Sequence, residues 1–300
     1  MNDAYPSSAP PCIEVSRLTR RFGAKAALDD VSLTVPTGGV FGLIGANGAG
    51  KTTLIKHLLG MLRAEQGSVR VFGQDPIENP VGVLGRIGYL SEDRDLPDWM
   101  RVSELMGYTQ AFFPNWDEKY AEELRDAFEL NPNARIKTLS RGQRARAGLL
   151  AALAHRPPLL VLDEPSSGLD PVVRRDILSA IIRTIAEEGR TVLFSSHLLD
   201  EVERVADRVA IINQGRLLLT ASMDEVKDRH RRVTLRFNQP HERPPSLVGA
   251  FSHSGGGFEW TYLCNGESEQ LRQAAGAIGA TVVDDAALTL DEIFVSHVVR

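Results

Sequence analysis

The chain of 300 residues is 43% hydrophobic and 24% charged, a balance that is typical of folded globular proteins and excludes a disordered chain. Its formal net charge of −5 argues against nucleic-acid binding. Two isolated cysteines, Cys12 and Cys264, exclude a disulfide framework and favour a reducing compartment. The opening residues lack the basic and apolar regions of a secretory signal, and the longest nearly apolar stretch, residues 147–154, is far shorter than the roughly 20 residues that cross a bilayer. We therefore expect a soluble cytoplasmic protein that reaches a membrane only through a partner.

The first part of the chain predicts three strands followed by one helix. Residues 1–12, which are rich in Pro, Ser and Ala, are predicted to form a flexible tail. Alternating apolar residues predict strands over residues 13–18 and 27–35, and the compact apolar run at residues 40–44 predicts a buried strand. Leucine and isoleucine at helical spacing then predict a helix over residues 51–62.

The middle of the chain is predicted to be a helical insertion over about residues 93–157. A strand-like run at residues 86–90 precedes it, and residues 92–135 show helical periodicity, acidic side chains and most of the aromatic residues. This apolar group either packs the core of the insertion or forms a docking surface for a partner helix, and the sequence leaves both open. The residues weighed for docking are Trp99, Met100, Tyr108, Phe112 and Phe113, and Trp116 and Phe128 complete the aromatic group.

Strands alternate with helices between residues 159 and 206. Apolar runs predict strands over residues 159–162 and 191–194, and helical spacing predicts helices over residues 171–188 and 198–206. This alternation favours an α/β fold whose mostly parallel sheet is covered by helices on both faces.

The last quarter of the chain has weaker patterns and predicts a small α+β domain over residues 225–300, beside a larger domain over residues 13–224. A run of charges at residues 224–232 marks the boundary. The predicted strands cover residues 233–237, 258–263 and 281–283, and the predicted helices cover residues 269–278 and 290–299.

Residues 45–52, with the sequence GANGAGKT, fit the pattern G-x-x-x-x-G-K-[ST] between a predicted strand and a predicted helix. Glycines allow backbone N–H groups to surround a phosphate, and the N terminus of the helix attracts the anion. Lys51 would reach the β- and γ-phosphates, and the Thr52 hydroxyl would bind Mg²⁺. The nucleotide-binding residues predicted here are Gly45, Ala46, Asn47, Gly48, Ala49, Gly50, Lys51, Thr52 and Thr53.

Two carboxyl groups follow the predicted strand at residues 159–162, at the strand end where ligands bind in parallel sheets. Asp163 suits a Mg²⁺ contact, directly or through water, because this ion prefers oxygen ligands. Glu164 could polarise the attacking water as a general base. These residues predict nucleotide hydrolysis.

Together with three further motifs and one aromatic position, these residues resemble the ATP-binding cassette (ABC) ATPases. Residues 139–143, LSRGQ, resemble the signature sequence of that family, and residues 166–170, SSGLD, resemble its D-loop. His197, which follows a predicted strand, resembles the switch histidine. Phe22 stands where the family stacks an aromatic ring on adenine.

The resemblance implies a P-loop NTPase core with an antiparallel β subdomain and a helical insertion. It also implies that two cassettes, either two copies of this chain or this chain and a homologous cassette, face each other head to tail around two ATP molecules. Ser140, Gly142 and Gln143 would then bind the ATP held by the partner, and His197 would contact the γ-phosphate. The resemblance further implies a separate integral membrane permease and a peripheral position on the inner face of the cell membrane.

Two positions depart from the family pattern. Arg141 replaces a glycine of the signature, and Glu92 stands at the usual Q-loop glutamine. A carboxylate can bind Mg²⁺ as an amide oxygen does, so we interpret Glu92 as a metal-site and signalling residue; the alternative is a solvated loop glutamate. Residues 290–294, LDEIF, and the small C-terminal domain resemble the ATPase subunits of exporters.

Two functions from different classes are compatible with the motifs. The first is the ATPase subunit of an ABC transporter, driving a separate permease. The second is a soluble ABC-type ATPase that acts on the ribosome or on DNA. A single cassette, an insertion too short for a long coiled coil and an acidic net charge all favour the transporter. The transported substrate depends on the permease and cannot be inferred from this chain.

Overall fold

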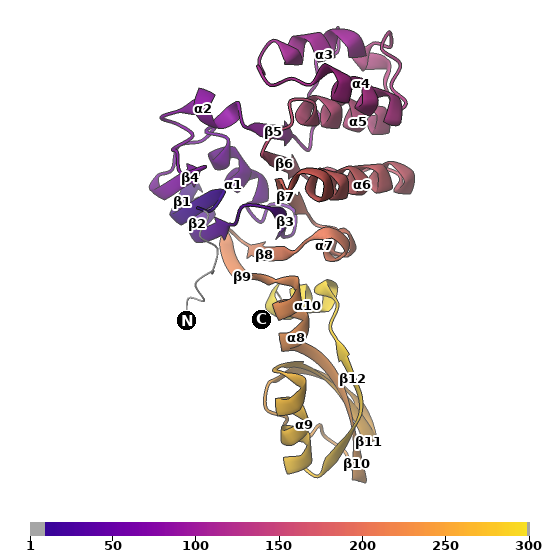
Figure 1. The fold of residues 1–300 in the computed structure, drawn as a ribbon. Coiled ribbons are helices and arrows are strands. Elements are labelled where there is room, and N and C mark those ends of the chain that lie inside the picture. Colours follow the sequence, from indigo (N-terminus) through magenta and orange to yellow (C-terminus); the bar gives the residue numbers. More distant parts are fainter. Residues whose placement is uncertain (1–9, 299–300) are drawn as a thin grey trace. The chain divides into compact units, whose positions relative to one another are not determined.

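A computed structural model describes the backbone of residues 10–298, and the side chains of that range apart from residues 183–188 and 297–298 (Figure 1). The chain divides into two compact units, Met1–Thr220 and Ala221–Arg300. The sequence placed this boundary at residue 224, within a run of charges. That run instead forms helix α8 (Met223–Arg229), which Ser222 caps and which leads directly into strand β10 (His230–His241) of the second unit.

A six-stranded sheet forms the centre of the first unit, in the order β5-β6-β7-β3-β8-β9. The pairs β5–β6, β6–β7, β7–β3 and β3–β8 are all parallel, which confirms the predicted mostly parallel sheet. The sequence patterns did not single out the last two strands. The strands are β3 (Gly39–Ile44), β5 (Ile87–Leu90), β6 (Leu159–Asp163), β7 (Thr191–Ser196), β8 (Arg208–Asn213) and β9 (Arg216–Ser222).

Helices cover both faces of this sheet, with α1 (Lys51–Leu58) on one face and α6 (Pro171–Glu188) and α7 (Leu199–Val205) on the other (Figure 1). Gly42 permits the close approach of α7, because a Cβ atom there would lie 2.5 Å from Val202 Cγ1. Helix α1 ends before the predicted residue 62, since Gly60 adopts the left-handed φ of 67°.

The α1 helix belongs to the main core of the first unit. Leu54, Ile55 and Leu58 are fully buried, and burial of each such side chain stabilises the fold by about 1.5–3 kcal/mol. A short helix, α2 (Pro80–Leu84), precedes β5 and is capped by Asn79.

A second, antiparallel sheet has the order β2-β1-β4, as the family resemblance implied. It contains β1 (Ile13–Phe22), β2 (Lys25–Val35) and β4 (Gln66–Val71), and the mostly polar β4 was not predicted. The predicted tail is wrong at Cys12, which is buried and whose N–H donates to the carbonyl oxygen of Val35 at 2.9 Å. Residues 1–9 of that tail lie outside the described residues.

The helical insertion contains α3 (Val102–Gln110), α4 (Glu118–Ala127) and α5 (Arg141–Leu153). Helical structure does not begin at residue 92, as the periodicity suggested. Residues 91–100 form a loop, and α3 begins only after Arg101, whose backbone N–H donates to the Glu104 carboxylate at 2.7 Å. None of the helices in the described residues is long and apolar enough to traverse a bilayer.

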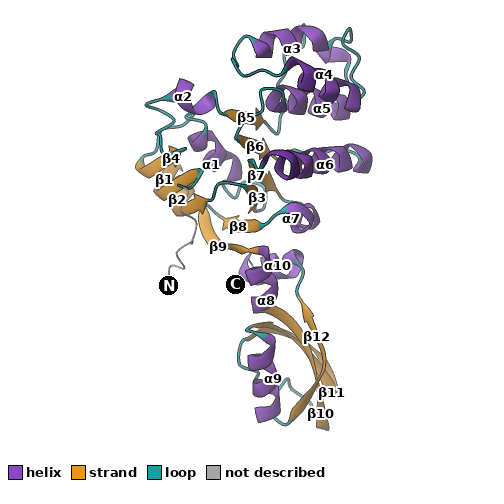
Figure 2. Cartoon of the chain, in the orientation of Figure 1, coloured by secondary structure: helices purple, strands orange, loops and turns teal. Residues whose placement is uncertain are grey.

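The second unit contains an antiparallel sheet with the order β11-β10-β12 and is α+β, as predicted. Figure 2 shows helix α9 along one face of this sheet, where Leu271 and Ala275 pack against apolar residues of the strands. The strands are longer than the sequence patterns suggested. The remaining elements are β11 (Ala250–Asn265), α9 (Ser268–Ala277), β12 (Ala280–Ala287) and α10 (Leu290–Val298).

Candidate active site

The predicted site residues lie together at the carboxyl ends of four parallel strands of the sheet. Strand β3 leads into the glycine-rich loop, β5 leads to Glu92, β6 ends at Asp163 and Glu164, and β7 leads to His197. The register pairs Asp163 with Ser195 and aligns the end of β3 with the end of β7. Ligands bind at such strand ends because backbone and side chains from several connections converge there.

Two glycines give the loop its shape. A Cβ atom at Gly45 would lie 2.5 Å from the carbonyl oxygen of Ile212, and one at Gly50 would lie 2.6 Å from that of Ala27. Gly50 also has a φ of 117°, which side-chain-bearing residues rarely adopt. The loop is therefore held against β2 and β8, and it leads directly into α1 at Lys51, the arrangement that binds phosphate.

The ammonium group of Lys51 is buried at the centre of the site. Its Nζ donates to the carbonyl oxygens of Gly45 at 2.5 Å and Ala46 at 3.3 Å, and it lies 2.9 Å from Glu164 Oε1. A phosphate group at the loop would compete with Glu164 for this cation, because both are anions. Binding of a phosphate to Lys51 would therefore displace the Glu164 carboxylate from the lysine.

The Asp163 carboxylate fits a divalent cation. Its Oδ1 accepts from the Ser195 hydroxyl at 2.7 Å, but its buried Oδ2 has no hydrogen-bond partner among the described residues. Burial raises the pKa of Asp163, and hydrogen bonds from Ser195 and Thr52 only partly offset this effect. A buried oxygen without a partner, beside the Thr52 hydroxyl, matches the hard oxygen ligands that Mg²⁺ prefers.

Glu164, which follows β6, is held by Ser195 at the end of β7 and by His197 just after it. Its Oε2 lies 2.8 Å from His197 Nδ1, and its backbone N–H donates to Ser195 Oγ at 2.9 Å. The residue has a φ of 47°, in the left-handed region that glutamate rarely occupies, which is typical of functional sites. Sequence reasoning missed Ser195, whose only signal is its place two residues before His197 in β7.

Glu92 is exposed and lies on the loop that follows β5. Partial burial and the nearby charges of Glu164 and Asp163 raise its pKa, and Lys51 acts in the opposite direction. No group of three or more histidine, cysteine or acidic residues in the described part of the chain could by itself hold a metal ion. A metal here would therefore also need hydroxyl and phosphate oxygens as ligands.

A cavity of about 470 Å³ lies over the glycine-rich loop and contains the positions expected for a nucleotide. Phe22 is half-exposed at this cavity, and the Arg20 guanidinium lies 4.9 Å from the centre of its ring. Sequence reasoning missed Lys25, a cation at the turn between β1 and β2. The lining residues are Phe22, Lys25, Ala27, Asn47, Gly48, Ala49, Gly50, Lys51, Thr52, Thr53, Glu92 and Glu164.

The signature-like residues do not line this cavity. Ser140 is exposed and caps α5, since its hydroxyl accepts from the Gln143 N–H at 3.2 Å and the Gln143 side chain accepts from the Ser140 N–H at 3.0 Å. Gly142 packs against α6, where a Cβ atom would lie 2.7 Å from Val173 Cγ2. The fold of one chain therefore leaves Ser140, Gly142 and Gln143 away from the glycine-rich loop.

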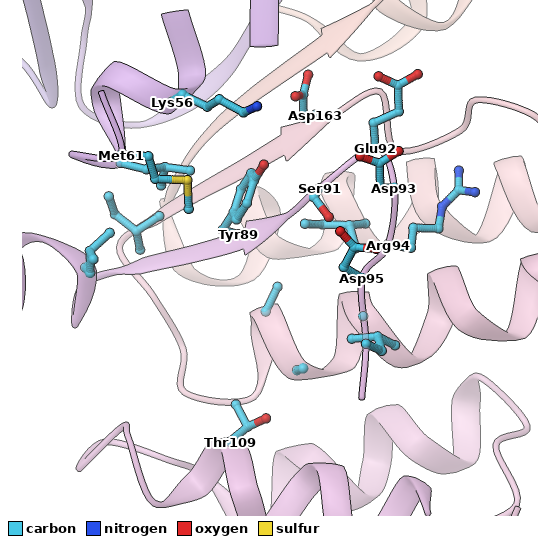
Figure 3. A pocket seen from close by; sticks show the side chains of 18 of the residues that line it. Lys56, Met61, Tyr89, Ser91, Glu92, Asp93, Arg94, Asp95, Thr109 and Asp163 are labelled. Atoms are coloured by element: carbon cyan, nitrogen blue, oxygen red, sulfur yellow. The ribbon is translucent and has the colours of Figure 1, made fainter. Parts of the chain in front are cut away.

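A larger cavity of about 570 Å³ lies between the sheet edge and the helical insertion. Figure 3 shows Asp163 and Glu92 at one end of this cavity and Thr109 of α3 at the other. In its wall the ring of Phe113 stacks on His155 at 3.7 Å, and burial lowers the pKa of His155 to about 4. Thr52 and Glu92 line both cavities, so the two cavities adjoin at these residues.

The aromatic group of the insertion is divided between core and surface. Phe128 is buried, whereas Trp99 is 73% exposed, Phe112 62% and Tyr108 50%. Several aromatic side chains of the insertion are therefore exposed to solvent rather than buried in its core.

Comparison with known proteins places the site in a family. A family model described as ABC transporter matches residues 28–167. The chain is 27% identical to the ABC transporter ATP-binding protein YtrB of Bacillus subtilis over 95% of this chain and 97% of YtrB. It is 37% identical to the daunorubicin/doxorubicin resistance ATP-binding protein DrrA of Streptomyces peucetius over 72% of this chain and 66% of DrrA. It is 32% identical to the bacitracin transport ATP-binding protein BcrA of Bacillus licheniformis over 73% of this chain and 72% of BcrA.

Solved structures agree with these relatives. The ATP-binding subunit of an ABC transporter superposes with a TM-score of 0.66 at 27% identity, covering 72% of this chain and 92% of that chain. A dimeric bacterial ABC transporter cassette, 21% identical, has the same fold with a TM-score of 0.64 over 70% of this chain and 98% of that chain. The chain therefore belongs to the ABC transporter family, as an ATP-binding subunit with ATPase activity.

Proposed function

We propose that this chain hydrolyses Mg-ATP in a head-to-tail pair of cassettes and drives export through a separate membrane permease. The observation that carries the proposal is that Lys51, Asp163, Glu164 and His197 meet at the carboxyl ends of the parallel strands, where Lys51 and Glu164 line the nucleotide cavity. The proposal joins three parts, namely the chemistry at this edge, the second cassette and the membrane partner.

The nucleotide would lie over the glycine-rich loop. Residues 45–53 surround its phosphates, the Lys51 ammonium binds the β- and γ-phosphates, and the half-exposed ring of Phe22 stacks on adenine. Lys25, which also lines the cavity, adds a second cation on the phosphate side of the loop. Both lysines favour binding of a polyanion.

Thr52, Asp163 and Glu92 would hold the magnesium ion, and Asp163 Oδ2 has no hydrogen-bond partner among the described residues. When bound, the ion neutralises charge that develops on the phosphate oxygens. Glu92 would contribute from the exposed side of the site, where partial burial and then the neighbouring carboxylates raise its pKa, and a bound cation would offset the repulsion between these carboxylates.

Glu164 would act as the general base. Phosphate binding to Lys51 would release Glu164 Oε1, which could then accept a proton from the attacking water. His197 Nδ1 lies 2.8 Å from the other carboxylate oxygen, so it would fix the direction of the base, and its second ring nitrogen could contact the γ-phosphate.

A second cassette would complete each site. Ser140, Gly142 and Gln143 lie at the exposed N terminus of α5 and away from the cavity of their own chain. The N terminus of a helix binds anions, so the ATP of a partner cassette is the ligand that would use these groups. Either a second copy or a homologous cassette would serve.

The relatives support transport, and two of them support export. DrrA carries the name of a drug-resistance protein and BcrA that of a bacitracin transport protein. The exposed aromatic residues of the insertion would receive the permease, which would hold the chain on the inner face of the cell membrane. The alternative, action on the ribosome or on DNA, has no support among these relatives.

The assignment of the general base is tested with Glu164→Gln. This change keeps the size of the side chain but removes the proton acceptor, so we expect hydrolysis to fall by about 10²–10⁴-fold while ATP binding persists. Phosphate release and the binding of a fluorescent ATP analogue measure the two effects. Lys51→Ala is the contrasting variant, because it should lose nucleotide affinity itself. Near wild-type turnover of Glu164→Gln would show that another group accepts the proton.

A further inference from the structure

Arg94 lies on the loop after β5 and is only 9% exposed, although its neighbours Asp93 and Asp95 are exposed. Its backbone has a left-handed φ of 50°. In Figure 3 the Arg94 side chain leaves the loop in a different direction from Glu92, which extends to the side of Asp163. The loop thus exposes Glu92 beside the candidate active site and buries the side chain of Arg94.

The Arg94 guanidinium contacts the turn that follows Glu164. Its Nη2 donates to the carbonyl oxygen of Ser167 at 2.7 Å and to that of Pro165 at 3.2 Å. The same turn is closed by a hydrogen bond from the Ser167 N–H to the Glu164 carbonyl oxygen at 3.1 Å. Arg94 therefore binds the two residues on either side of Ser166, within the D-loop-like segment.

This contact is an unusual use of a buried arginine. Both acceptors are neutral carbonyl oxygens, and the buried Nε of Arg94 has no hydrogen-bond partner among the described residues. Removing a guanidinium from water is costly unless a carboxylate compensates for it. A side chain that served only to fill space would not need this charge.

The opposite side of the turn is held by a second buried charge. The Ser166 hydroxyl donates to the carboxylate of Glu201, which is buried in α7 just after His197. The turn beside Glu164 is thus tied to the segment that carries Glu92 and to the segment that carries His197.

We propose that Arg94 is a positioning residue that connects the loop bearing Glu92 to the turn bearing Glu164. The loop of residues 91–96 lines the larger cavity, and Glu164 is the first residue of the turn that Arg94 contacts. Displacement of the loop would move the carbonyl oxygens of Pro165 and Ser167 and so change the alignment of the base. The inference rests on the proposed role of Glu164 as general base.

The expected signature is a loss of turnover without a loss of ATP affinity. A misplacement of about 1 Å in a catalytic group lowers a rate by up to about 10²-fold. We therefore expect Arg94→Gln to lower kcat by about tenfold or more with KM for ATP within about twofold of wild type. Arg94→Lys keeps the charge and a donor but not the geometry of the guanidinium, so its kcat should recover to about a third of the wild-type value.

A matched control distinguishes loss of the contact between Arg94 and the turn from the effect of removing any arginine. Arg101 lies at the end of the same loop, and its Nη1 also donates to a backbone carbonyl oxygen, that of Asn133, at 2.5 Å, but it does not contact the turn. Arg101→Gln should keep kcat within about twofold of wild type. Thermal unfolding of all three variants verifies that each is folded.

Three results would overturn the inference. The first is a kcat of Arg94→Gln equal to that of Arg101→Gln, and the second is a rise in the KM of Arg94→Gln that accounts for its whole loss of kcat/KM. The third is a kcat of Arg94→Lys no higher than that of Arg94→Gln. If Arg94→Gln does not fold, Arg94→Lys must still show a lower kcat at unchanged KM, and a wild-type kcat would again overturn the inference. Glu164→Gln, measured in parallel, tests the base by itself, so failure of the proposed function is distinguished from failure of this inference.

Discussion

At the scale of single residues, several carboxyl groups lie close together at the strand ends beside the nucleotide cavity. Burial raises the pKa of Asp163, and partial burial together with the charges of Glu164 and Asp163 raises that of Glu92. Lys51 is the cation that opposes this repulsion through its contact with Glu164. If phosphate bound Lys51, a divalent cation could supply the positive charge that these carboxyl groups would otherwise lose.

We predict that Glu92→Gln lowers the apparent affinity for Mg²⁺ without removing hydrolysis. The amide restores the residue usual in the family but lacks the negative charge that attracts the ion. Hydrolysis should stay within about tenfold of wild type, because no general base is lost. The Mg²⁺ concentration for half-maximal phosphate release should rise.

Asp95→Asn is the matched control for this change. Asp95 is exposed on the same loop and lines the larger cavity but not the nucleotide cavity, so its Mg²⁺ dependence should equal that of wild type. An unchanged Mg²⁺ dependence in Glu92→Gln would identify Glu92 as a solvated loop residue. A loss as deep as that of Glu164→Gln would reverse the two assigned roles.

At the scale of elements, α7 and the turn after β6 are joined by a buried carboxylate. Burial raises the pKa of Glu201, although the Ser166 hydroxyl and Arg174 act in the opposite direction. Because the folded-state pKa lies above the ordinary value of 4.5, the folded protein binds more protons than the unfolded chain at pH values above 4.5. The free energy of unfolding therefore falls as pH rises through this window.

We predict that Glu201→Gln removes this contribution. The amide oxygen can still accept from Ser166, but the side chain no longer ionises. The melting temperature of the variant, relative to wild type, should be lowest near pH 4 and should increase as the pH is raised toward about 7. Differential scanning calorimetry across that range measures it. A difference that stays constant or decreases with pH contradicts the prediction.

The helical insertion carries both buried apolar residues and exposed aromatic side chains. Its buried residues, among them Leu105, Tyr120 and Leu124, pack its own core, and its exposed aromatic residues do not contribute to that packing. Trp99 and Phe112 present most of their side chains to solvent, although the Phe112 ring also packs edge to face against Tyr108.

We predict that Trp99→Glu and Phe112→Glu weaken binding to the membrane permease. A charge in a desolvated apolar contact is unfavourable, so the yield of permease in a detergent pull-down should fall at least about tenfold. Phe258→Glu is the control, since Phe258 is similarly exposed, at 54%, but belongs to the second unit. If all three variants recover the permease at full yield, the docking surface lies elsewhere.

At the scale of the whole molecule, one chain contains the two halves of the proposed site but does not bring them together. The glycine-rich loop and the N terminus of α5 both present groups that bind anions, yet Ser140 does not line the nucleotide cavity. Activity would thus depend on a second cassette, and the dimer should form only around bound ATP.

We predict that a charge at Ser140 prevents this dimer. In the Glu164→Gln background with Mg-ATP, Ser140→Asn should elute as a dimer on size-exclusion chromatography, whereas Ser140→Asp should remain monomeric. Both side chains can cap α5, but only aspartate repels the γ-phosphate of the partner. If Ser140→Asp dimerises as well as Ser140→Asn, the signature does not meet the phosphate.

Part of the fold and site could be predicted because it depends on short stretches of sequence. The glycine-rich loop, Asp163, Glu164 and His197 are recognised by residue type next to a buried strand, and the alternation of strands and helices predicted the parallel sheet. Prediction failed where the local pattern was weak or misleading. The polar β4 lacked an apolar signal, and residues 91–100 form a loop despite their periodicity.

The sequence by itself therefore determined the phosphate-binding loop and the acidic residues after β6, because their chemistry is carried by neighbours in the chain. Only the tertiary structure decided the roles of Ser195, Arg94 and Glu201. Each is an ordinary polar residue whose partner is more than 30 positions away, and strand register and helix packing bring the two together. Such contacts have no local signature, because hydrogen bonding and burial depend on which distant segments the core places side by side.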